Sequence, residues 1–174
     1  AAIWIEKNET ARRVRQRIGA VLDWAYSKNY RETEAPMRAL SKGLPRATAP
    51  RGHHAAMPYT DVAAFMARLR ERETKGRLAL EVAILTAARS SEIREATWDE
   101  FDLEAGLWSI PGLRMKRDKP HVVPLSPAAI AALKRALALR ENNAALVFES
   151  SVKDKPLSDA TLGKVLKDMG ESVT

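Results

Sequence analysis

The feature that most constrains the fold is the stretch 77–88, in which nearly every side chain is apolar. Its apolar residues are Leu78, Ala79, Leu80, Val82, Ala83, Ile84, Leu85, Ala87 and Ala88. A helix that is apolar on most of its sides must be covered by other elements, because water would otherwise meet its hydrophobic surface. The stretch therefore predicts a buried helix at the core of a domain.

Bulk composition excludes several classes of protein. Of the 174 residues 45% are hydrophobic and 29% charged, and no apolar run approaches the roughly 20 residues that cross a bilayer. We therefore expect a soluble globular chain without a membrane partner. The chain has no cysteine, which excludes disulfides, thiolate metal sites and a cysteine nucleophile. The start has neither an initiator Met nor the apolar core of a signal peptide, so we expect an excised fragment.

The positive charge is concentrated near the N-terminus. Residues 1–56 hold 11 Lys and Arg against 5 Asp and Glu, a net charge of +6, whereas residues 57–174 hold 18 against 17, a net charge of +1. An excess of this kind suits a region that follows a phosphate backbone. A solvated, Arg-rich helix face explains it equally well, and charge alone does not choose.

Residues 10–25 carry half of this basic excess, with four arginines against one aspartate. Apolar residues recur there at the spacing of one helical face, and the positions between them hold four arginines that are candidate contacts to a phosphate backbone: Arg12, Arg13, Arg15 and Arg17. The following stretch, 36–56, contains Pro36, Pro45, Pro50 and Gly52 and has no sustained periodicity. It predicts an interdomain linker with at most one helical turn.

The rest of the chain predicts helices on both sides of a small sheet. We expect a helix after Pro58, a short helix capped by Ser90 or Ser91, a helix that Ser126 caps, and a last helix that Ser158 caps. Between them, 107–110 and 121–125 predict antiparallel strands, with Pro124 at a strand end or edge. In the helix after Ser126 we expect Ile130, Leu133 and Leu137 to face inward. The predicted fold class is mainly α with a small antiparallel β-sheet (α+β).

Arg89 directly follows the apolar stretch, within Thr86-Ala-Ala-Arg-Ser-Ser-Glu-Ile93. Arginine is costly to bury without a partner, and its planar fork suits bidentate contact with phosphate or carboxylate. A salt bridge to Glu92, three residues later, is the alternative that needs no ligand.

These residues, followed by Trp98-Asp-Glu-Phe-Asp102, resemble the first conserved box of the tyrosine recombinases of the phage integrase family. That box usually reads T-G-x-R-x-x-E and then W-x-x-[IF]-D, and Ala87 stands here in place of the usual Gly. The resemblance implies that Arg89 is the first of two catalytic arginines that bind the scissile phosphate. It also implies that Glu92 gives structural support.

A second motif, Met115-Lys-Arg-Asp-Lys-Pro-His-Val-Val-Pro-Leu-Ser126, resembles the β-hairpin of the same family. Its catalytic lysine stands eight residues before the proline of V-P-L, which here is Lys116. A lysine at a hairpin tip can protonate the departing 5′ oxygen. Lys119 is a rival for this role, and Arg114, Arg117 and Lys119 are candidate phosphate contacts. A solvated, charged turn is the alternative.

The three histidines do not suggest a metal site. His121 stands alone at the start of a predicted strand and receives no catalytic role. His53 and His54 lie in the linker without a third ligand at metal-site spacing. We expect no metal and no cofactor.

The family's second box, H-x-x-R with a later tyrosine nucleophile, is not found. No histidine has an arginine three residues later, and Tyr26, Tyr30 and Tyr59 all precede Arg89. We therefore expect a chain truncated before this box. By resemblance, 1–35 is the end of the helical core-binding domain, 36–56 the linker, and 57–174 the front of the catalytic domain.

The resemblance implies a site-specific recombinase that cuts and rejoins duplex DNA through a 3′-phosphotyrosyl intermediate, as a homotetramer when full length. The segments ETARRVRQRIGAVLDWA and HHAAMPYTDV further resemble integrases of satellite prophages and genomic islands. This implies a place in the bacterial cytoplasm at the nucleoid. The alternative is a non-catalytic DNA-binding relic or regulator derived from an integrase. An unrelated helical interaction protein would require both motifs to match by chance.

Overall fold

The computed structural model describes residues 2–45, 55–115, 118–141 and 143–173. The chain divides into two compact units, Ala1–His53 and His54–Thr174. In the described part of the chain, no helix combines the length and the apolar character needed to cross a membrane.

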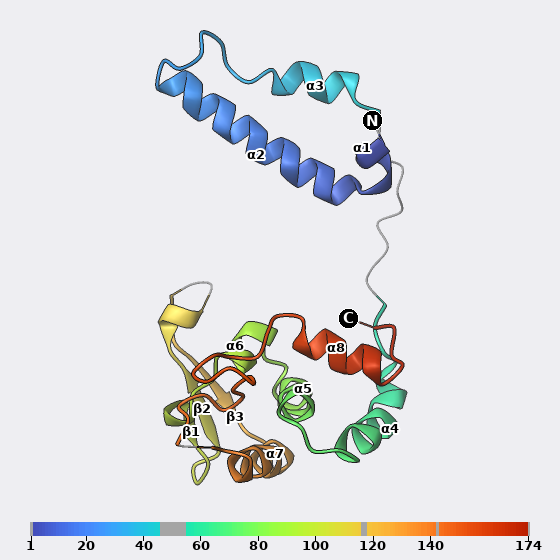
Figure 1. Ribbon diagram of the computed structural model, residues 1–174, viewed down its shortest axis with the longest axis vertical. Coiled ribbons are helices and arrows are strands. Elements are labelled where there is room, and N and C mark those ends of the chain that lie inside the picture. Colours follow the sequence, from blue (N-terminus) through green and yellow to red (C-terminus); the bar gives the residue numbers. More distant parts are fainter. Residues whose placement is uncertain (1, 46–54, 116–117, 142, 174) are drawn as a thin grey trace. The chain divides into compact units, whose positions relative to one another are not determined.

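The first unit is helical. Its elements are α1 (Ala2–Glu6), α2 (Asn8–Ser27) and α3 (Met37–Gly43) (Figure 1). Gly19 of α2 lies against Met37, since a Cβ at Gly19 would stand 2.9 Å from the Met37 Cε atom. The indole Nε1 of Trp4 donates a hydrogen bond to the carbonyl oxygen of Pro45 at 2.9 Å. Helix α3 corrects the expectation of at most one turn in 36–56, because Met37–Gly43 forms a continuous helix despite the prolines on either side of it.

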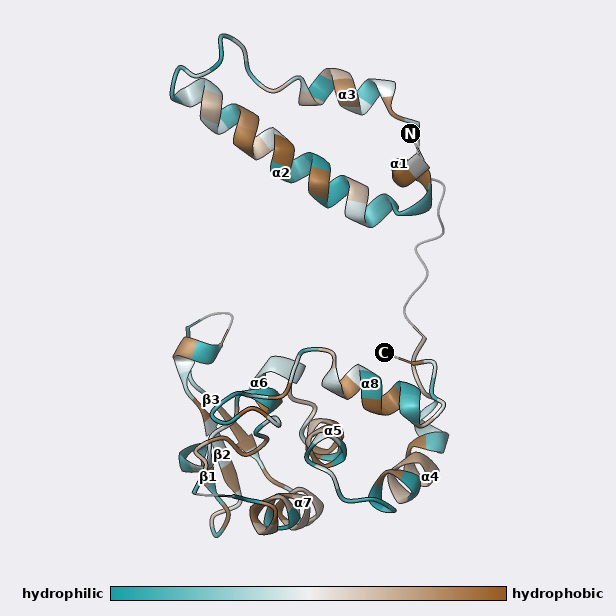
Figure 2. Ribbon diagram, viewed as in Figure 1, coloured by the Kyte–Doolittle hydropathy of each residue, from teal (hydrophilic) through white to brown (hydrophobic). Residues whose placement is uncertain are grey.

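The apolar face of α2 is exposed within this unit. The side chains of Val14, Ile18 and Val21 are 46%, 53% and 63% exposed, whereas Ala11 and Gly19 are buried. Figure 2 shows hydrophobic bands along α2 that alternate with hydrophilic ones. Small residues therefore form the buried side of this helix.

The second unit is built around α5, as the apolar stretch predicts. Its helices are α4 (Tyr59–Arg70), α5 (Lys75–Thr86), α6 (Ser90–Arg94), α7 (Pro127–Ala138) and α8 (Thr161–Asp168). Helix α5 contacts each of the other four, and Figure 1 shows it nearly end-on between α4, α7 and α8. Leu78, Ala79 and Val82 are almost fully buried, so the prediction of a buried central helix is confirmed.

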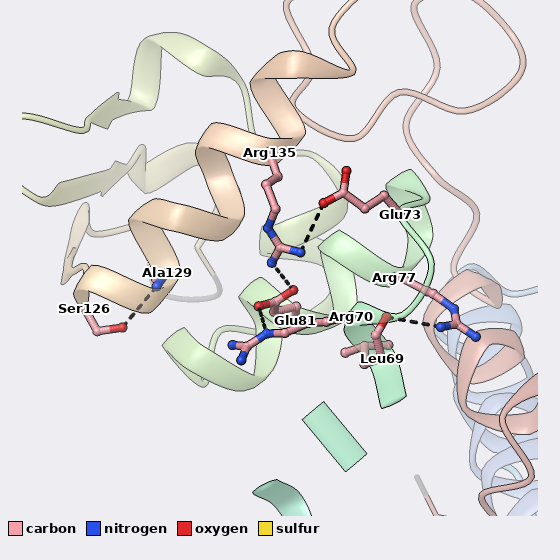
Figure 3. A network of polar contacts seen from close by, with 8 residues as sticks. All are labelled: Leu69, Arg70, Glu73, Arg77, Glu81, Ser126, Ala129 and Arg135. Atoms are coloured by element: carbon pink, nitrogen blue, oxygen red, sulfur yellow. Dashed lines mark hydrogen bonds and ion pairs between the residues drawn. The ribbon is translucent and has the colours of Figure 1, made fainter. Parts of the chain in front are cut away.

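A buried carboxylate joins three of these helices. Glu81 of α5 is 2% exposed, and its two oxygens accept from Arg70 Nε of α4 at 2.7 Å and from Arg135 Nη2 of α7 at 2.5 Å (Figure 3). Arg135 also pairs with Glu73 at 3.4 Å. Hydrogen-bonded partners on both oxygens are what a carboxylate requires at this depth.

The sheet has three antiparallel strands in the order β1-β2-β3. They are β1 (Phe101–Asp102), β2 (Leu107–Ile110) and β3 (His121–Pro124), preceded by the 3-10 helix η1 (Trp98–Glu100). Trp108 pairs with Val123, and Ile110 pairs with His121. Trp108 and Ile110 are fully buried, so this face of β2 completes the core. The predicted class, mainly α with a small antiparallel sheet, is confirmed.

Some details of the helices differ from expectation. Leu137 of α7 is 42% exposed, because α7 turns its alanines and Leu133 toward α5. Short alanine side chains allow two helices to pack closely. Helix α8 begins after Ala160, and the Ser158 hydroxyl instead pairs with that of Thr161 at 2.9 Å. The expected cap at Ser126 is confirmed, since its hydroxyl accepts from the backbone N–H of Ala129 at 3.2 Å (Figure 3).

Candidate functional site

Arg89 lies at the junction between α5 and α6. Helix α5 ends at Thr86, and Ala87 follows in the left-handed conformation with φ +53°. This conformation costs an L-residue about 1 kcal/mol, and glycine adopts it freely, which explains why the resembling motif usually has glycine here. Arg89 occupies the N-cap position of α6, directly before its first turn. The expectation that Ser90 or Ser91 caps this helix was wrong, because both serines lie inside it.

Glu92 holds Arg89 in place. Its carboxylate accepts from the backbone N–H of Arg89 at 2.9 Å and from Arg89 Nη1 at 2.6 Å. The Glu92 side chain is 5% exposed and that of Arg89 is 65% exposed. One end of the interaction is thus buried, while the guanidinium, which has five N–H donors, faces solvent with donors to spare.

Glu92 remains charged in this environment. Burial raises the pKa of its carboxyl group, but the hydrogen bonds from Arg89 and the positive charges of Arg89 and His121 outweigh burial, so the pKa lies below its ordinary value of 4.5. The ionised form can therefore keep accepting both hydrogen bonds from Arg89 at neutral pH.

A pocket of about 380 Å³ opens beside Arg89. It is lined by residues from the α5–α6 junction, from the β2–β3 connection and from β3: Thr86, Ala87, Ala88, Arg89, Glu92, Met115, His121 and Val123. His121, an ionisable residue to which the sequence analysis gave no role, is one of them. A signal was available, because His121 and Val123 are two positions apart on one strand and therefore share a face.

The connection between β2 and β3 begins with the 3-10 helix η2 (Gly112–Arg114). Its two arms come close together, since a Cβ at Gly112 would lie 2.7 Å from the carbonyl oxygen of Asp118. Only glycine fits this approach. Lys119 is exposed on the second arm. The predicted catalytic Lys116 and its neighbour Arg117 lie outside the described residues.

Arg114 does not face solvent as a phosphate contact would. Its side chain is 18% exposed, forms an ion pair with the buried Glu100, and donates from Nη1 to the carbonyl oxygen of Glu92 at 3.1 Å. The structure thus places Arg114 inside the second unit, beside the helix that carries Glu92.

The four arginines of α2 belong to the first unit. Arg12 and Arg13 are exposed and pair with Glu9, Arg13 Nε at 3.0 Å and Arg12 Nη1 at 4.0 Å. Arg15 stacks over the Trp4 ring at 5.5 Å, and Arg17 is exposed. Arg12, Arg13 and Arg15 line a groove between α2 and Met37 of α3, with a volume of about 480 Å³.

The described residues contain no group of three or more His, Cys, Asp and Glu side chains that could hold a metal ion.

Two family models match the chain. The model of the phage integrase family covers residues 56–173, which include Arg89, Glu92 and the β2–β3 connection. The chain belongs to the phage integrase family. A second model, of the phage integrase central domain, covers residues 1–42, so both units match parts of integrases.

Known integrases also resemble this family member along most of its length. The integrase of Enterobacteria phage P4 is 30% identical over 178 residues, covering 94% of this chain and 40% of that protein. The prophage integrase IntZ of Escherichia coli (strain K12) is 35% identical over 163 residues, covering 93% of this chain and 40% of that protein. The chain thus spans about 40% of the length of these relatives.

Solved structures share the integrase fold at low sequence identity. A Tn1549 transposon integrase in complex with a circular intermediate DNA matches with a TM-score of 0.70 and 14% identity, over 92% of this chain and 57% of that one. A lambda integrase tetramer bound to a Holliday junction matches with a TM-score of 0.67 and 16% identity, over 94% of this chain and 47% of that one.

Proposed function

We propose that this chain is the DNA-binding part of a site-specific tyrosine recombinase, with Arg89 binding a non-bridging oxygen of the scissile phosphate. The observation that carries the proposal is the placement of Arg89. Its side chain is 65% exposed at a pocket, yet the buried carboxylate of Glu92 accepts one hydrogen bond from its guanidinium and one from its backbone N–H. A fixed cation with free donors at a solvent-open pocket is suited to bind phosphate.

We propose further roles for residues around this site. Lys116 acts as the general acid that gives a proton to the departing 5′ oxygen, as its register in the second motif implies. Lys119 and Arg117 contact the phosphate backbone, as do Arg12, Arg13, Arg15 and Arg17 of α2. Glu92 supports Arg89 and does not react. In this assignment 1–35 ends a core-binding domain, 36–56 is a linker, and 57–174 begins the catalytic domain.

The whole protein, in this proposal, exchanges a phosphodiester bond of duplex DNA for a 3′-phosphotyrosyl bond and later reverses the exchange. The reaction conserves bond energy and needs no nucleotide. It takes place on paired attachment sites within a homotetramer, at the nucleoid of a bacterial cell. Support comes from the named relatives, one of them a phage integrase and one a prophage integrase, and from a solved relative described as a tetramer on a Holliday junction.

Salt-dependent binding to duplex DNA tests the DNA-binding part. In a fluorescence anisotropy titration, the 174-residue chain should bind unrelated duplexes with similar affinity and without cleaving them. Each phosphate contact contributes about −0.9 to the slope of log K against log salt. Substituting Arg13→Gln and Arg17→Gln should therefore make the slope shallower by about 1 to 2.

Lys164→Gln is the matched control, because Lys164 is exposed and pairs with Asp168 on α8, outside the proposed contacts. It should leave the slope unchanged. An affinity that stays constant between low and moderate salt would contradict DNA binding by this chain. Continuation of the parent open reading frame with H-x-x-R and a later tyrosine separates a recombinase from a non-catalytic relative.

A further inference from the structure

We propose that Arg114 is a positioning residue that ties the β2–β3 connection to α6 and so sets the place of this connection relative to Arg89. The inference rests on the proposed function, because it concerns the same phosphate site. It assigns to Arg114 a role inside the protein rather than on the DNA.

The contacts of Arg114 join three elements. Nη1 donates to the carbonyl oxygen of Glu92 in α6 at 3.1 Å, and Nη2 pairs with Glu100 of η1. The same Glu100 oxygen accepts from Trp108 Nε1 of β2 at 2.9 Å. Arg114 itself ends η2, at the root of the connection. One side chain therefore links the connection to α6 and to the sheet.

The ion pair between Arg114 and Glu100 is largely buried, so its stability depends on how well the partners are placed. The Glu100 side chain is 5% exposed and that of Arg114 is 18% exposed. The Arg114 Nε atom is buried without a hydrogen-bond partner among the described residues. A buried donor without a partner lowers the stability of the fold, so burying Arg114 here has a cost in folding free energy. Lysine would replace it only in part, because an ammonium keeps the charge but lacks the planar fork that reaches two partners.

Glu92 connects Arg114 to the phosphate site. Its backbone carbonyl oxygen accepts a hydrogen bond from Arg114, and its carboxylate accepts two from Arg89. Met115, the residue after Arg114, lines the Arg89 pocket. In the sequence Lys116 comes next. A shift of the connection by about 1 Å would be expected to slow a reaction that needs both groups by roughly 100-fold.

The test measures single-turnover cleavage by the whole protein on two duplexes that differ in one atom. In one duplex the bridging 5′ atom at the scissile phosphate is oxygen, and in the other it is sulfur. In both, a tyrosine oxygen bonds to phosphorus as the bond to the 5′ atom breaks. The 5′ alkoxide must take a proton from the general acid. A thiol ionises near pH 8.5, as cysteine does, so the sulfur departs as a thiolate without one.

Arg114→Met should slow cleavage of the oxygen duplex by about 10- to 100-fold. On the sulfur duplex its rate should return close to that of the unmodified protein. On the oxygen duplex, Arg114→Lys should cleave at a rate between those of Arg114→Met and the unmodified protein, because lysine keeps the charge without the fork. A variant that is merely less stable would slow both duplexes in the same proportion.

Arg94→Met is the matched control. Arg94 lies on α6, the helix that carries Glu92, and its Nε atom is likewise buried without a hydrogen-bond partner in the part of the chain that the structure describes. Its Nη1 donates to the carbonyl oxygen of Leu157 at 2.8 Å. Among the described residues it forms no hydrogen bond or ion pair with the β2–β3 connection, so the ratio of its cleavage rates on the two duplexes should equal that of the unmodified protein. If Arg114→Met does not fold, Glu100→Gln replaces it, since glutamine keeps an acceptor for Trp108 but loses the charge that faces Arg114.

Equal slowing of both duplexes by the Arg114 variants, or no slowing, would overturn this inference. Lys116→Met separates it from the proposed function. If the sulfur duplex rescues Lys116→Met but not Arg114→Met, only the positioning role fails. If it does not rescue Lys116→Met, or if the unmodified protein cleaves neither duplex, the proposed function fails and the inference with it.

Discussion

Among single residues, Glu92 has the most consequences for the proposed site. It is nearly fully buried, yet the hydrogen bonds and charge of Arg89 keep it ionised. Its backbone carbonyl oxygen also accepts a hydrogen bond from Arg114. The site thus depends on a residue that would not itself touch DNA, and the orientation of Arg89 should depend on the charge of this carboxylate.

Glu92→Gln should therefore destabilise the second unit in a pH-dependent way. Because folding lowers the pKa of Glu92 below 4.5, its ionised form contributes stability above that pH, and this contribution is lost as pH falls through the lower folded value. At pH 7 the substitution should cost about 1.5–3 kcal/mol, the range for hydrogen bonds to a charged group. In urea unfolding at a series of pH values, the difference from the unmodified chain should shrink below pH 4.5.

Glu95→Gln is the control for this measurement, because Glu95 is exposed at the end of the same helix. Its substitution should change stability little at any pH. A Glu92→Gln penalty that stays the same from neutral to acidic pH would show that ionisation of Glu92 does not support the fold.

Among elements, α5 organises the second unit through both packing and charge. Its apolar residues meet four other helices, and Glu81 pairs with arginines from two of them. Replacing all members of a buried ion cluster by hydrophobic residues can leave stability unchanged. Removing a single member leaves the remaining buried charges without an opposite charge, which lowers stability. The network should therefore be sensitive to loss of its shared carboxylate.

Glu81→Gln should lower the free energy of unfolding by about 2–3 kcal/mol. This is less than the roughly 3–5 kcal/mol for a fully buried pair, because Arg70 and Arg135 are 44% and 30% exposed and water can partly solvate them. Glu73→Gln is the control, since Glu73 pairs with the same Arg135 at 3.4 Å and is 48% exposed. Its effect should be below about 1 kcal/mol. Equal losses in the two variants would contradict a special role for burial.

The sequence predicted the elements of the second unit well, because their signals are local. The apolar stretch predicted α5, and alternation with turn residues predicted the strands. What it missed depends on contacts between distant residues. Arg114 appeared as one of several basic residues in a charged turn, and nothing near it in the sequence shows that Glu100 and the Glu92 carbonyl oxygen accept its hydrogen bonds.

The exposed apolar face of α2 shows the same limit. Periodicity showed that Val14, Ile18 and Val21 share one face, but it cannot show what covers that face. The buried positions of α2 are the small residues Ala11 and Gly19, and their weak hydrophobicity gave little signal. His121 likewise received no role, because the strand period shows only that it shares a face with Val123, whereas its position beside Arg89 depends on contacts between distant residues.

At the scale of the whole molecule, the two units differ in how much apolar surface they bury. The second contains the continuous core, whereas the described residues of the first form three helices with several large apolar side chains exposed. A unit of about 40–60 residues buries little surface, and a lone helix of ordinary length is only marginally stable in water. The two units should therefore open independently and with unequal ease.

Hydrogen exchange measured by mass spectrometry should show this difference. Amides of α2 should exchange through local opening, at rates little affected by low urea, while those of α5 should exchange only through global unfolding of the second unit. Glu81→Gln should accelerate exchange in α5 and leave α2 unchanged. Equal protection of α2 and α5, with the same response to the substitution, would indicate a single cooperative unit.

The junction that holds Arg89 has a consequence for mutational surveys. Because Arg89 follows α5 after a left-handed residue, the backbone of the central helix determines where its charge lies. Enlarging a fully buried alanine such as Ala79 would move that charge without altering any group that meets a ligand. Screens for lost function would then score such core positions as though they belonged to the binding surface. Separating the two classes requires a stability measurement on each variant.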